Sequence, residues 1–188
     1  MCGRYTGYVD DCEELKTIYT KARIAYPRTD FAVGEIFPTN TVPLLTGIGG
    51  ELRPFAASWG FPGVGGKGVI INARAETAAE KPMFAESFAK RRCIVPATGY
   101  YEWTKDKTRY LFQTPGRGII YLGALWRRCE DGVRFVILTV PANRTAATVH
   151  DRMPVVLDSD SLTAWSVDLS YALGYVNRAM PELVGTEA

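Results

Sequence analysis

Several short runs of the chain are rich in apolar, β-branched and aromatic residues and are separated by turn-forming residues, a pattern typical of β-strands. We expect strands at residues 41–46, 52–59, 93–97, 99–104, 109–114, 118–126, 133–140 and 154–157. Gly47, Gly49 and Gly50 separate the first two runs and indicate a turn. The glycine-rich stretch 61–68 is expected to be a loop.

Helical periodicity is confined to a few segments. We expect helices at residues 11–23, 76–90 and 159–167. Pro82 falls in the second of these, at an early-turn position that tolerates proline. Asp158 or Ser159 is a suitable N-cap for the third. Many strands and few helices, without regular βαβ alternation, predict an α+β fold with a mostly antiparallel, barrel-like central sheet and peripheral helices.

Length and composition predict a single globular domain over residues 1–188. The 188 residues are 47% apolar and 22% charged, with no internal repeat. No run of about 18 apolar residues is present, so we expect no membrane contact. The N-terminus lacks the basic and apolar regions of a secretory signal. We therefore expect a cytoplasmic protein, nucleoid-associated if its source is bacterial.

The cysteines and the single histidine do not form a metal-binding pattern. Four cysteines, at positions 2, 12, 93 and 129, lack the short pair spacing of zinc ligands or a disulfide framework. We expect no metal and no cofactor. Cys12, Cys93 and Cys129 are interpreted as small buried hydrophobic residues.

The net charge of +2 does not by itself indicate a nucleic-acid-binding protein. A DNA site would need positive charge gathered in one groove. The chain supplies arginines for such a groove at Arg4, Arg74, Arg91, Arg92, Arg144 and Arg152.

Cys2 becomes the first residue when the initiator methionine is removed, and it then carries a free α-amine beside its thiol. The amine has an ordinary pKa of about 7.7–8.0, so a fraction is nucleophilic near neutral pH. It can condense with an aldehyde, and the thiol can close on the imine carbon as a five-membered thiazolidine. By position alone, Cys2 reads more simply as part of a mobile chain end.

Three further polar residues are candidates for chemistry, each with a plainer interpretation. His150 is the only imidazole, and it equally suits an exposed turn. Glu102 shares a strand face with Tyr100 if residues 99–103 alternate, which would desolvate its carboxylate and raise its pKa. A strand glutamate facing water is the simpler alternative. Asn72 follows an apolar run and could orient an amine, although such asparagines usually cap turns.

Five motifs occur together in order along the chain: MCGRYT at the start, WGF (59–61), INARAET (71–77), GYYEW (99–103) and HDRMPVVL (150–157). In this order and spacing the chain resembles the SOS-response-associated peptidase (SRAP) family over residues 1 to about 165. The resemblance implies an α+β fold, a positively charged groove and covalent crosslinking to abasic sites in single-stranded DNA.

The resemblance also implies roles for individual residues. Cys2 would be the crosslinking nucleophile, Asn72 would hold its amine, and Glu102 would act as the acid or base and serve removal of Met1. His150 would assist opening of the abasic sugar and proton transfer at the imine. The implied DNA contacts are Arg4, Arg74 and Arg152 at phosphates, with Trp59 and Thr139 near the strand. Trp59 would suit stacking on an unpaired base.

The chain departs from the family pattern at three places. Glu35-Ile36-Phe37-Pro38 stands where the family commonly has Asn-x-Ala-Pro. Pro82 replaces an arginine, with Lys81 beside it. The C-terminus is short, and residues 175–180 are its closest match to a late family strand.

Two other functions fit the residue types. One is a thiol peptidase acting on other proteins, with Cys2, His150 and Glu102 as nucleophile, base and orienting residue. The other is a non-catalytic module that binds single-stranded DNA. A lyase-like side activity is left open. We expect a monomer whose partner is single-stranded DNA containing abasic sites.

Overall fold

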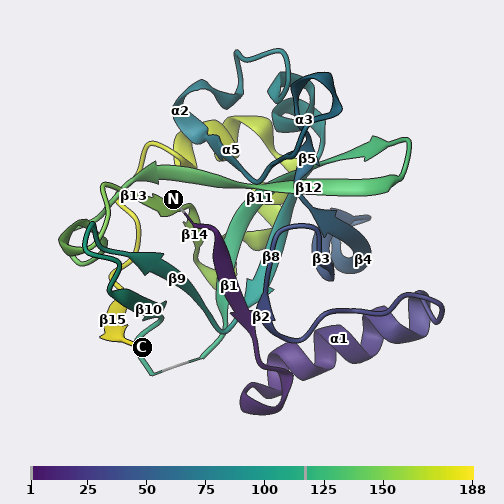
Figure 1. Cartoon of the computed structure of the whole chain (residues 1–188). Helices are drawn as coiled ribbons and strands as arrows, with labels where there is room; N and C mark the ends of the chain where they lie inside the picture. The colour runs from purple at the N-terminus through teal and green to yellow at the C-terminus, as the bar shows by residue number, and fades with distance from the viewer. Residues whose placement is uncertain (1, 117) are drawn as a thin grey trace.

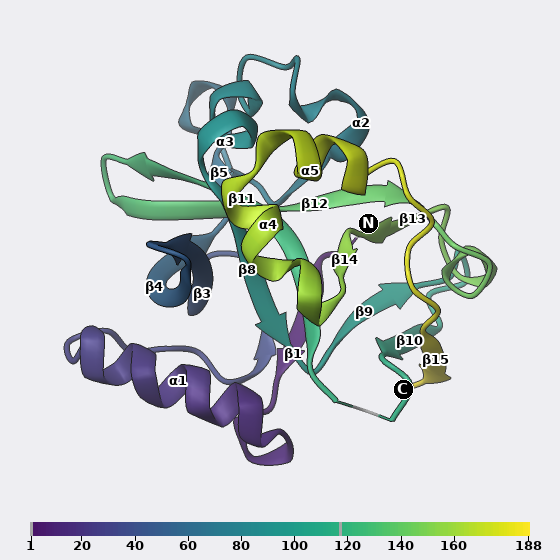
Figure 2. The same ribbon diagram turned by 180° about the vertical axis from the view of Figure 1, so that it is seen from behind.

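The computed structural model describes residues 2–116 and 118–188, which form two main sheets with helices at their periphery (Figures 1 and 2). The strands of the smaller sheet are β1 (Arg4–Gly7), β2 (Gly34–Ile36), β9 (Gly99–Trp103), β10 (Arg109–Gln113) and β15 (Val184–Glu187). The strands of the larger sheet are β3 (Thr41–Ile48), β4 (Glu51–Trp59), β7 (Asn72–Arg74), β8 (Arg92–Ala97), β11 (Ile120–Cys129), β12 (Gly132–Pro141), β13 (Arg152–Pro154) and β14 (Val156–Leu157). β5 (Phe61–Pro62) and β6 (Val69–Ile70) form a separate short pair.

The larger sheet closes on itself. Its strands run in the order β12-β4-β3-β8-β11, and β11 pairs again with β12. The pairings of β12 with β4 and with β7 are parallel, whereas its other pairings and those of the smaller sheet are antiparallel. The predicted α+β class with a mostly antiparallel central sheet is confirmed, and a ring of strands stands where we expected a barrel-like sheet.

The first predicted helix is confirmed as α1 (Glu13–Ala25). The second prediction is wrong in its continuity, because residues 76–90 contain two short helices, α2 (Ala75–Ala78) and α3 (Ala85–Lys90). Pro82 lies between them. It has no N–H to continue the helical hydrogen bonds, so the chain turns and restarts.

The third predicted helix lies near the C-terminal end of the chain. It is present as a short 3-10 turn, Ser159–Ser161, that leads into α4 (Leu162–Val167). α5 (Leu169–Tyr175) was not predicted; the Asp168 side chain caps it by accepting the Tyr171 N–H at 3.0 Å.

The interpretation of residues 175–180 as a late strand is wrong, since they form the end of α5 and the loop after it. The late strand is β15, which pairs with β10. Further 3-10 helices lie at Val9–Asp11, Val64–Gly66 and Ala146–Thr148. Among the described residues, no helix is long and apolar enough to cross a membrane.

The N-terminal strand β1 positions the beginning of the chain inside the molecule. It lies between β9 and β2, with Tyr5 opposite Tyr100, and it also packs beside β8 of the ring. The Tyr5 ring packs on Trp59 at a centroid distance of 5.1 Å. These contacts continue the apolar core up to Cys2, which is completely buried. Cys2 is therefore a packed part of the core and not part of a frayed end.

Candidate active site

Cys2 and Asn72 are joined directly. Asn72 begins β7, where parallel pairing with Ile137 of β12 sets its position. Its side-chain Nδ2 donates a hydrogen bond to the Cys2 carbonyl oxygen at 2.8 Å. Its Oδ1 is buried without a hydrogen-bond partner within residues 2–116 and 118–188. The amide therefore holds the backbone of Cys2 and keeps one acceptor available beside it.

The Cys2 thiol is held in its neutral form. Burial is the main cause that raises its pKa, and the Glu102 carboxylate raises it further. The sulfur lies 3.8 Å from the Arg4 carbonyl oxygen, to which the S–H donates weakly. In this state the thiol is enclosed, and a reaction requires the site around it to open. Met1, whose removal the resemblance implies, lies outside the described residues.

Glu102 and Tyr100 project from β9 toward the same interior. Glu102 is only 4% exposed and Tyr100 is completely buried, so alternation along β9 places both on the covered face. Burial is the main cause that raises the pKa of Tyr100, and the charges of Cys2 and Glu102 raise it further. The simpler interpretation of Glu102 as a glutamate facing water is therefore wrong. The hydroxyls of Tyr100 and Tyr5 are buried without partners in the described chain.

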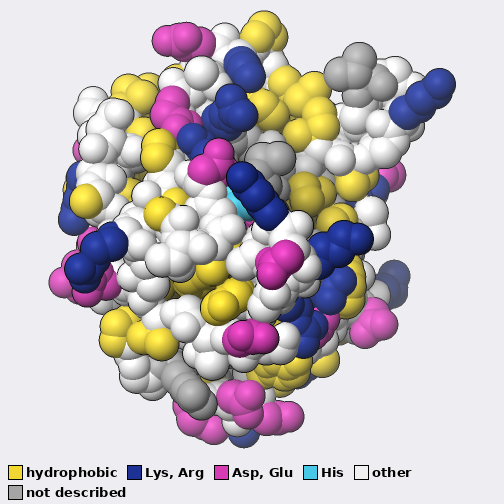
Figure 3. Space-filling view, turned by 60° about the vertical axis from the view of Figure 1, so that its left-hand side comes forward, with side chains coloured by type: hydrophobic (Ala, Val, Ile, Leu, Met, Phe, Trp, Pro, Cys, Tyr) yellow, Lys and Arg dark blue, Asp and Glu magenta, His cyan; other side chains and the backbone are white. Residues whose placement is uncertain are grey.

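His150 lies on the wall of a separate cavity of about 1090 Å³, which it shares with Trp103 and Thr148. Its Nδ1 is 3.0 Å from the Arg152 backbone nitrogen and 2.9 Å from an Asp151 carboxylate oxygen. Nδ1 accepts the Arg152 N–H when it carries no proton and donates to Asp151 when it carries one, so the two contacts alternate with the placement of the ring proton. In Figure 3 the imidazole, the only cyan side chain, reaches the surface beside Lys or Arg side chains.

Arg152 is fixed by neighbours within the chain. It forms a two-pronged ion pair with Glu76, and its Nη2 donates to the Thr139 carbonyl oxygen at 2.6 Å. Hydrogen bonding from Arg152 is the main cause that lowers the pKa of Glu76. The Arg152 side chain is 13% exposed. It braces the segment after His150, and this engagement limits what it can offer to a phosphate.

Arg4 is also paired. Its Nη1 contacts Glu35 Oε2 at 3.1 Å, and the other oxygen of Glu35 contacts Arg109 Nη1 at 3.2 Å. The Arg4 guanidinium lies over the Phe37 ring, 4.3 Å from its centroid. Glu35 and Phe37 are the residues at which the chain departs from the family pattern, and both surround Arg4.

Arg74 lies on the wall of a cavity that borders Asn72 and that has further cationic side chains. This cavity of about 860 Å³ is bordered by Asn72, Arg74, Lys81, Met83 and Arg127, among others. Within the described ranges, none of its three cations forms an ion pair with a carboxylate, which leaves their charge available to an anion. The sequence drew attention to Arg74 and Lys81 but not to Arg127. It lies in β11 without a motif around it, and only the fold brings it here.

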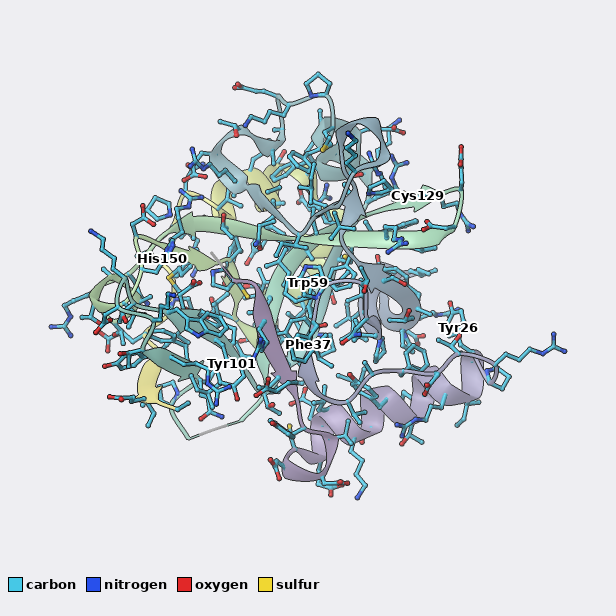
Figure 4. The ribbon with its side chains drawn as sticks, viewed as in Figure 1. Tyr26, Phe37, Trp59, Tyr101, Cys129 and His150 are labelled. Carbon is cyan, nitrogen blue, oxygen red and sulfur yellow. The ribbon has the colours of Figure 1, made fainter. Side chains whose placement is uncertain are left out.

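The predictions for two expected DNA contacts and for two cysteines are wrong. Trp59 is 0% exposed, and its Nε1 donates to the Ile71 carbonyl oxygen at 3.0 Å, so it has no face for a base. Figure 4 shows it in the middle of the molecule. Thr139 is likewise fully buried and cannot contact DNA directly. Of the three cysteines expected to be buried, Cys93 is buried, but Cys12 and Cys129 are only partly covered.

The fold and this site define a family. A smaller sheet packed against a ring of mostly antiparallel strands positions the buried Cys2, which is held by an asparagine and lies near a buried glutamate. The model of the SOS response associated peptidase (SRAP) family matches residues 1–171. The chain belongs to this family. Among the described residues, no group of three or more His, Cys, Asp or Glu side chains is arranged to hold a metal ion.

Relatives with assigned names are abasic site processing proteins. YoaM of Bacillus subtilis is 28% identical over 184 residues, covering 88% of this chain and 78% of that protein. YedK of Escherichia coli is 28% identical over 176 residues, covering 88% and 79%. YobE of Bacillus subtilis is 33% identical over 105 residues, covering 51% of this chain and 48% of YobE.

Solved structures share the fold. A protein from Bordetella bronchiseptica superposes with a TM-score of 0.80 at 20% identity, covering 100% of this chain and 99% of its own. A protein from Bacteroides thetaiotaomicron gives a TM-score of 0.74 at 22% identity, covering 93% and 86%. At these identities the similarity establishes the fold alone.

Proposed function

We propose that this protein recognises abasic sites in single-stranded DNA and binds them covalently through Cys2. The observation that carries the proposal is the hydrogen bond from Asn72 to the Cys2 carbonyl oxygen, because it fixes the backbone whose nitrogen would become the reactive amine. Family membership and relatives named as abasic site processing proteins support the same substrate.

The reaction begins when Met1 is removed and Cys2 acquires a free α-amine. Asn72 Oδ1, a buried acceptor without a described partner, suits an N–H of that amine and would direct its lone pair outward. Removal of Met1 by the site itself would use Glu102 as general base for the attacking water. Its burial beside Cys2 supports this role.

The abasic sugar opens from hemiacetal to aldehyde with His150 as the proton-transfer group. The Cys2 nitrogen then attacks the aldehyde carbon, and the carbonyl oxygen leaves as water after two protonations, which gives an imine. The Cys2 sulfur adds to the imine carbon while its proton passes to the nitrogen, and the thiazolidine ring closes. Glu102 is placed to carry protons in both steps. No oxidant or other reactant is needed.

The test is a denaturing gel of protein mixed with a single-stranded oligonucleotide that carries one abasic site. We expect a shifted band that survives denaturant with wild-type protein and with Cys129→Ala, and none with Cys2→Ala. Intact mass before the reaction should show loss of one methionine. Absence of the band in processed wild-type protein would refute the proposal.

Two further measurements, cleavage of protein substrates and binding to intact and abasic strands, separate the two alternatives. A chain with residues added ahead of Cys2 has a thiol but no α-amine at that position. If it still cleaves protein substrates, it is a thiol peptidase. If wild type binds intact and abasic strands equally and forms no covalent product, it is a binding module.

A further inference from the structure

The ion pairs around Glu35 affect how tightly the protein can bind undamaged single-stranded DNA. Glu35 lies in β2, which pairs with β1, and its carboxylate contacts Arg4 of β1 and Arg109 of β10 through separate oxygens at 3.1 and 3.2 Å. The three side chains are 27–34% exposed. They therefore lie where a DNA strand can reach them, unlike the enclosed Cys2.

Aromatic rings keep the two arginines in place. Arg4 is 4.3 Å from the Phe37 centroid and 5.4 Å from that of Trp103, and Arg109 is 4.7 Å from that of Tyr101. Figure 4 shows Phe37 and Tyr101 on the same side of the smaller sheet, near β1. Because the rings restrict the guanidinium groups, the carboxylate does not need to order them, and its main effect is on charge.

A carboxylate at this position competes with phosphate. An arginine binds phosphate through the same planar donors that Arg4 directs at Glu35. A phosphate at Arg4 must displace Glu35 or share the guanidinium with a like charge beside it. The ion pair between Arg152 and Glu76 differs, because the Arg152 side chain is only 13% exposed and also binds the Thr139 carbonyl oxygen, which makes that pair a structural brace.

We infer that Glu35 is a specificity-determining residue that keeps non-covalent binding of intact single-stranded DNA weak by neutralising Arg4. This inference rests on the proposed function. An intact strand then dissociates, and lasting retention depends on the covalent bond that only an aldehyde can form. Glu35 thus increases the discrimination between abasic and intact strands without touching the reacting atoms.

The experiment measures binding of an intact oligonucleotide by fluorescence anisotropy at several salt concentrations, using the processed full-length protein. We expect Glu35→Gln to bind more tightly by about twofold to fivefold at low salt, the scale of one partly exposed ion pair. For this variant, the slope of log affinity against log salt concentration should become more negative by roughly 0.7, the value for one added phosphate contact on a single strand. Glu51→Gln, which removes the same charge from an exposed pair with Arg53, should match wild type.

The gain must depend on Arg4. In the Arg4→Gln background we expect Glu35→Gln to add nothing, because the arginine that it releases is absent. In the crosslinking assay with an excess of intact strand as competitor, Glu35→Gln should lose more of its covalent product than wild type does. Equal affinity and salt slope in wild type and Glu35→Gln, or a gain that persists without Arg4, would overturn the inference; a thermal melt first confirms that each variant is folded.

The two possible failures are distinguishable. If wild type forms no covalent product while Glu35→Gln still gains Arg4-dependent affinity, the proposed function is wrong and the neutralisation of Arg4 stands. If wild type crosslinks but Glu35→Gln binds intact strands as wild type does, only the inference fails.

Discussion

Asn72 donates its side-chain N–H to the Cys2 carbonyl oxygen at 2.8 Å, a contact between residues 70 positions apart. It ties the start of β7 to the backbone of Cys2. The orientation of Cys2 thus depends on one amide, and the consequences of changing that amide can be measured.

Asn72→Leu preserves approximate volume but removes both polar atoms. We expect the free energy of unfolding to fall by about 1–3 kcal/mol, because the Cys2 carbonyl loses its donor in a buried place. The crosslinking rate should fall by about tenfold or more, since a loss of 1.4 kcal/mol of transition-state stabilisation is already tenfold. Urea unfolding and a timed denaturing gel measure the two effects. Asn177→Leu, which removes a comparable amide-to-backbone bond at the end of α5, should leave crosslinking unchanged.

Thiol labelling should follow burial. Cys2 and Cys93 are completely buried and burial raises the pKa of both, whereas Cys12 and Cys129 are partly exposed. Alkylation requires an accessible thiolate. In the folded protein that retains Met1, we expect iodoacetamide to modify Cys12 and Cys129 first, and raising the pH from 7 to 9 should not make Cys2 reactive. Peptide mass spectrometry measures the order; Cys2 labelled as fast as Cys129 contradicts the enclosed site.

The ion pair between Glu76 and Arg152 should make stability depend on acid pH. Arg152 lowers the pKa of Glu76 in the folded chain, so the unfolded chain binds a proton at a higher pH than the folded one does. The stabilisation is present above the ordinary glutamate pKa and is lost as the pH falls, between about pH 5 and pH 3. We expect Glu76→Gln to be less stable than wild type at pH 7 and the difference to shrink toward pH 3. Urea titrations at both pH values test this; a constant difference would argue against the pair as its source.

Trp59 should matter for stability and not for DNA. Trp59→Phe removes buried ring atoms and the hydrogen bond to Ile71, and we expect a loss of about 1–3 kcal/mol in the free energy of unfolding. The affinity of the folded variant for single-stranded DNA should stay within twofold of wild type, because the ring is completely covered. A large loss of affinity in folded protein would show that the ring becomes exposed on binding.

Tyr100→Phe is expected to be nearly neutral or stabilising by up to about 1 kcal/mol without DNA, because it removes a buried hydroxyl that lacks a described partner. Tyr175→Phe is the matched control. Its hydroxyl accepts the Asp158 N–H at 2.9 Å and contacts the Val156 carbonyl oxygen at 3.1 Å, so its loss should cost about 1–3 kcal/mol. Equal, substantial losses in both variants would indicate that Tyr100 has an ordered partner.

Much of the fold was readable from local pattern. The strands β3, β4 and β8 to β12 and the helix α1 were predicted, because apolar runs and helical periodicity reflect burial along a short stretch, whereas the short strands β1, β2, β7 and β15 were missed. The sequence also did not reveal the break at Pro82 or the helix α5. A proline can either begin a helix or interrupt one, and the local pattern does not distinguish these cases. The helix α5 depends on its cap at Asp168, and the apolar pattern after that cap is weak.

The candidate site also contains residues that the sequence predicted and residues that it misjudged. The motifs predicted one site formed by Cys2, Asn72, Glu102 and His150. The structure brings the first three together, whereas His150 lies on the wall of a separate cavity. Trp59 and Thr139 were misjudged as DNA contacts. Alternation shows that a strand has two faces, but it does not show which face another layer covers.

By itself, the sequence determined the chemistry that is available: a cysteine next to the initiator methionine, a single imidazole, and the motifs that identify the family. Tertiary structure alone decided which charges remain free. Glu35 pairs with Arg4 across 31 residues and with Arg109 across 74, and both contacts arise from strand register that no local pattern encodes. The long-range pairing of β1, β2, β9 and β10 thus converted a predicted phosphate-binding arginine into one already engaged by the chain.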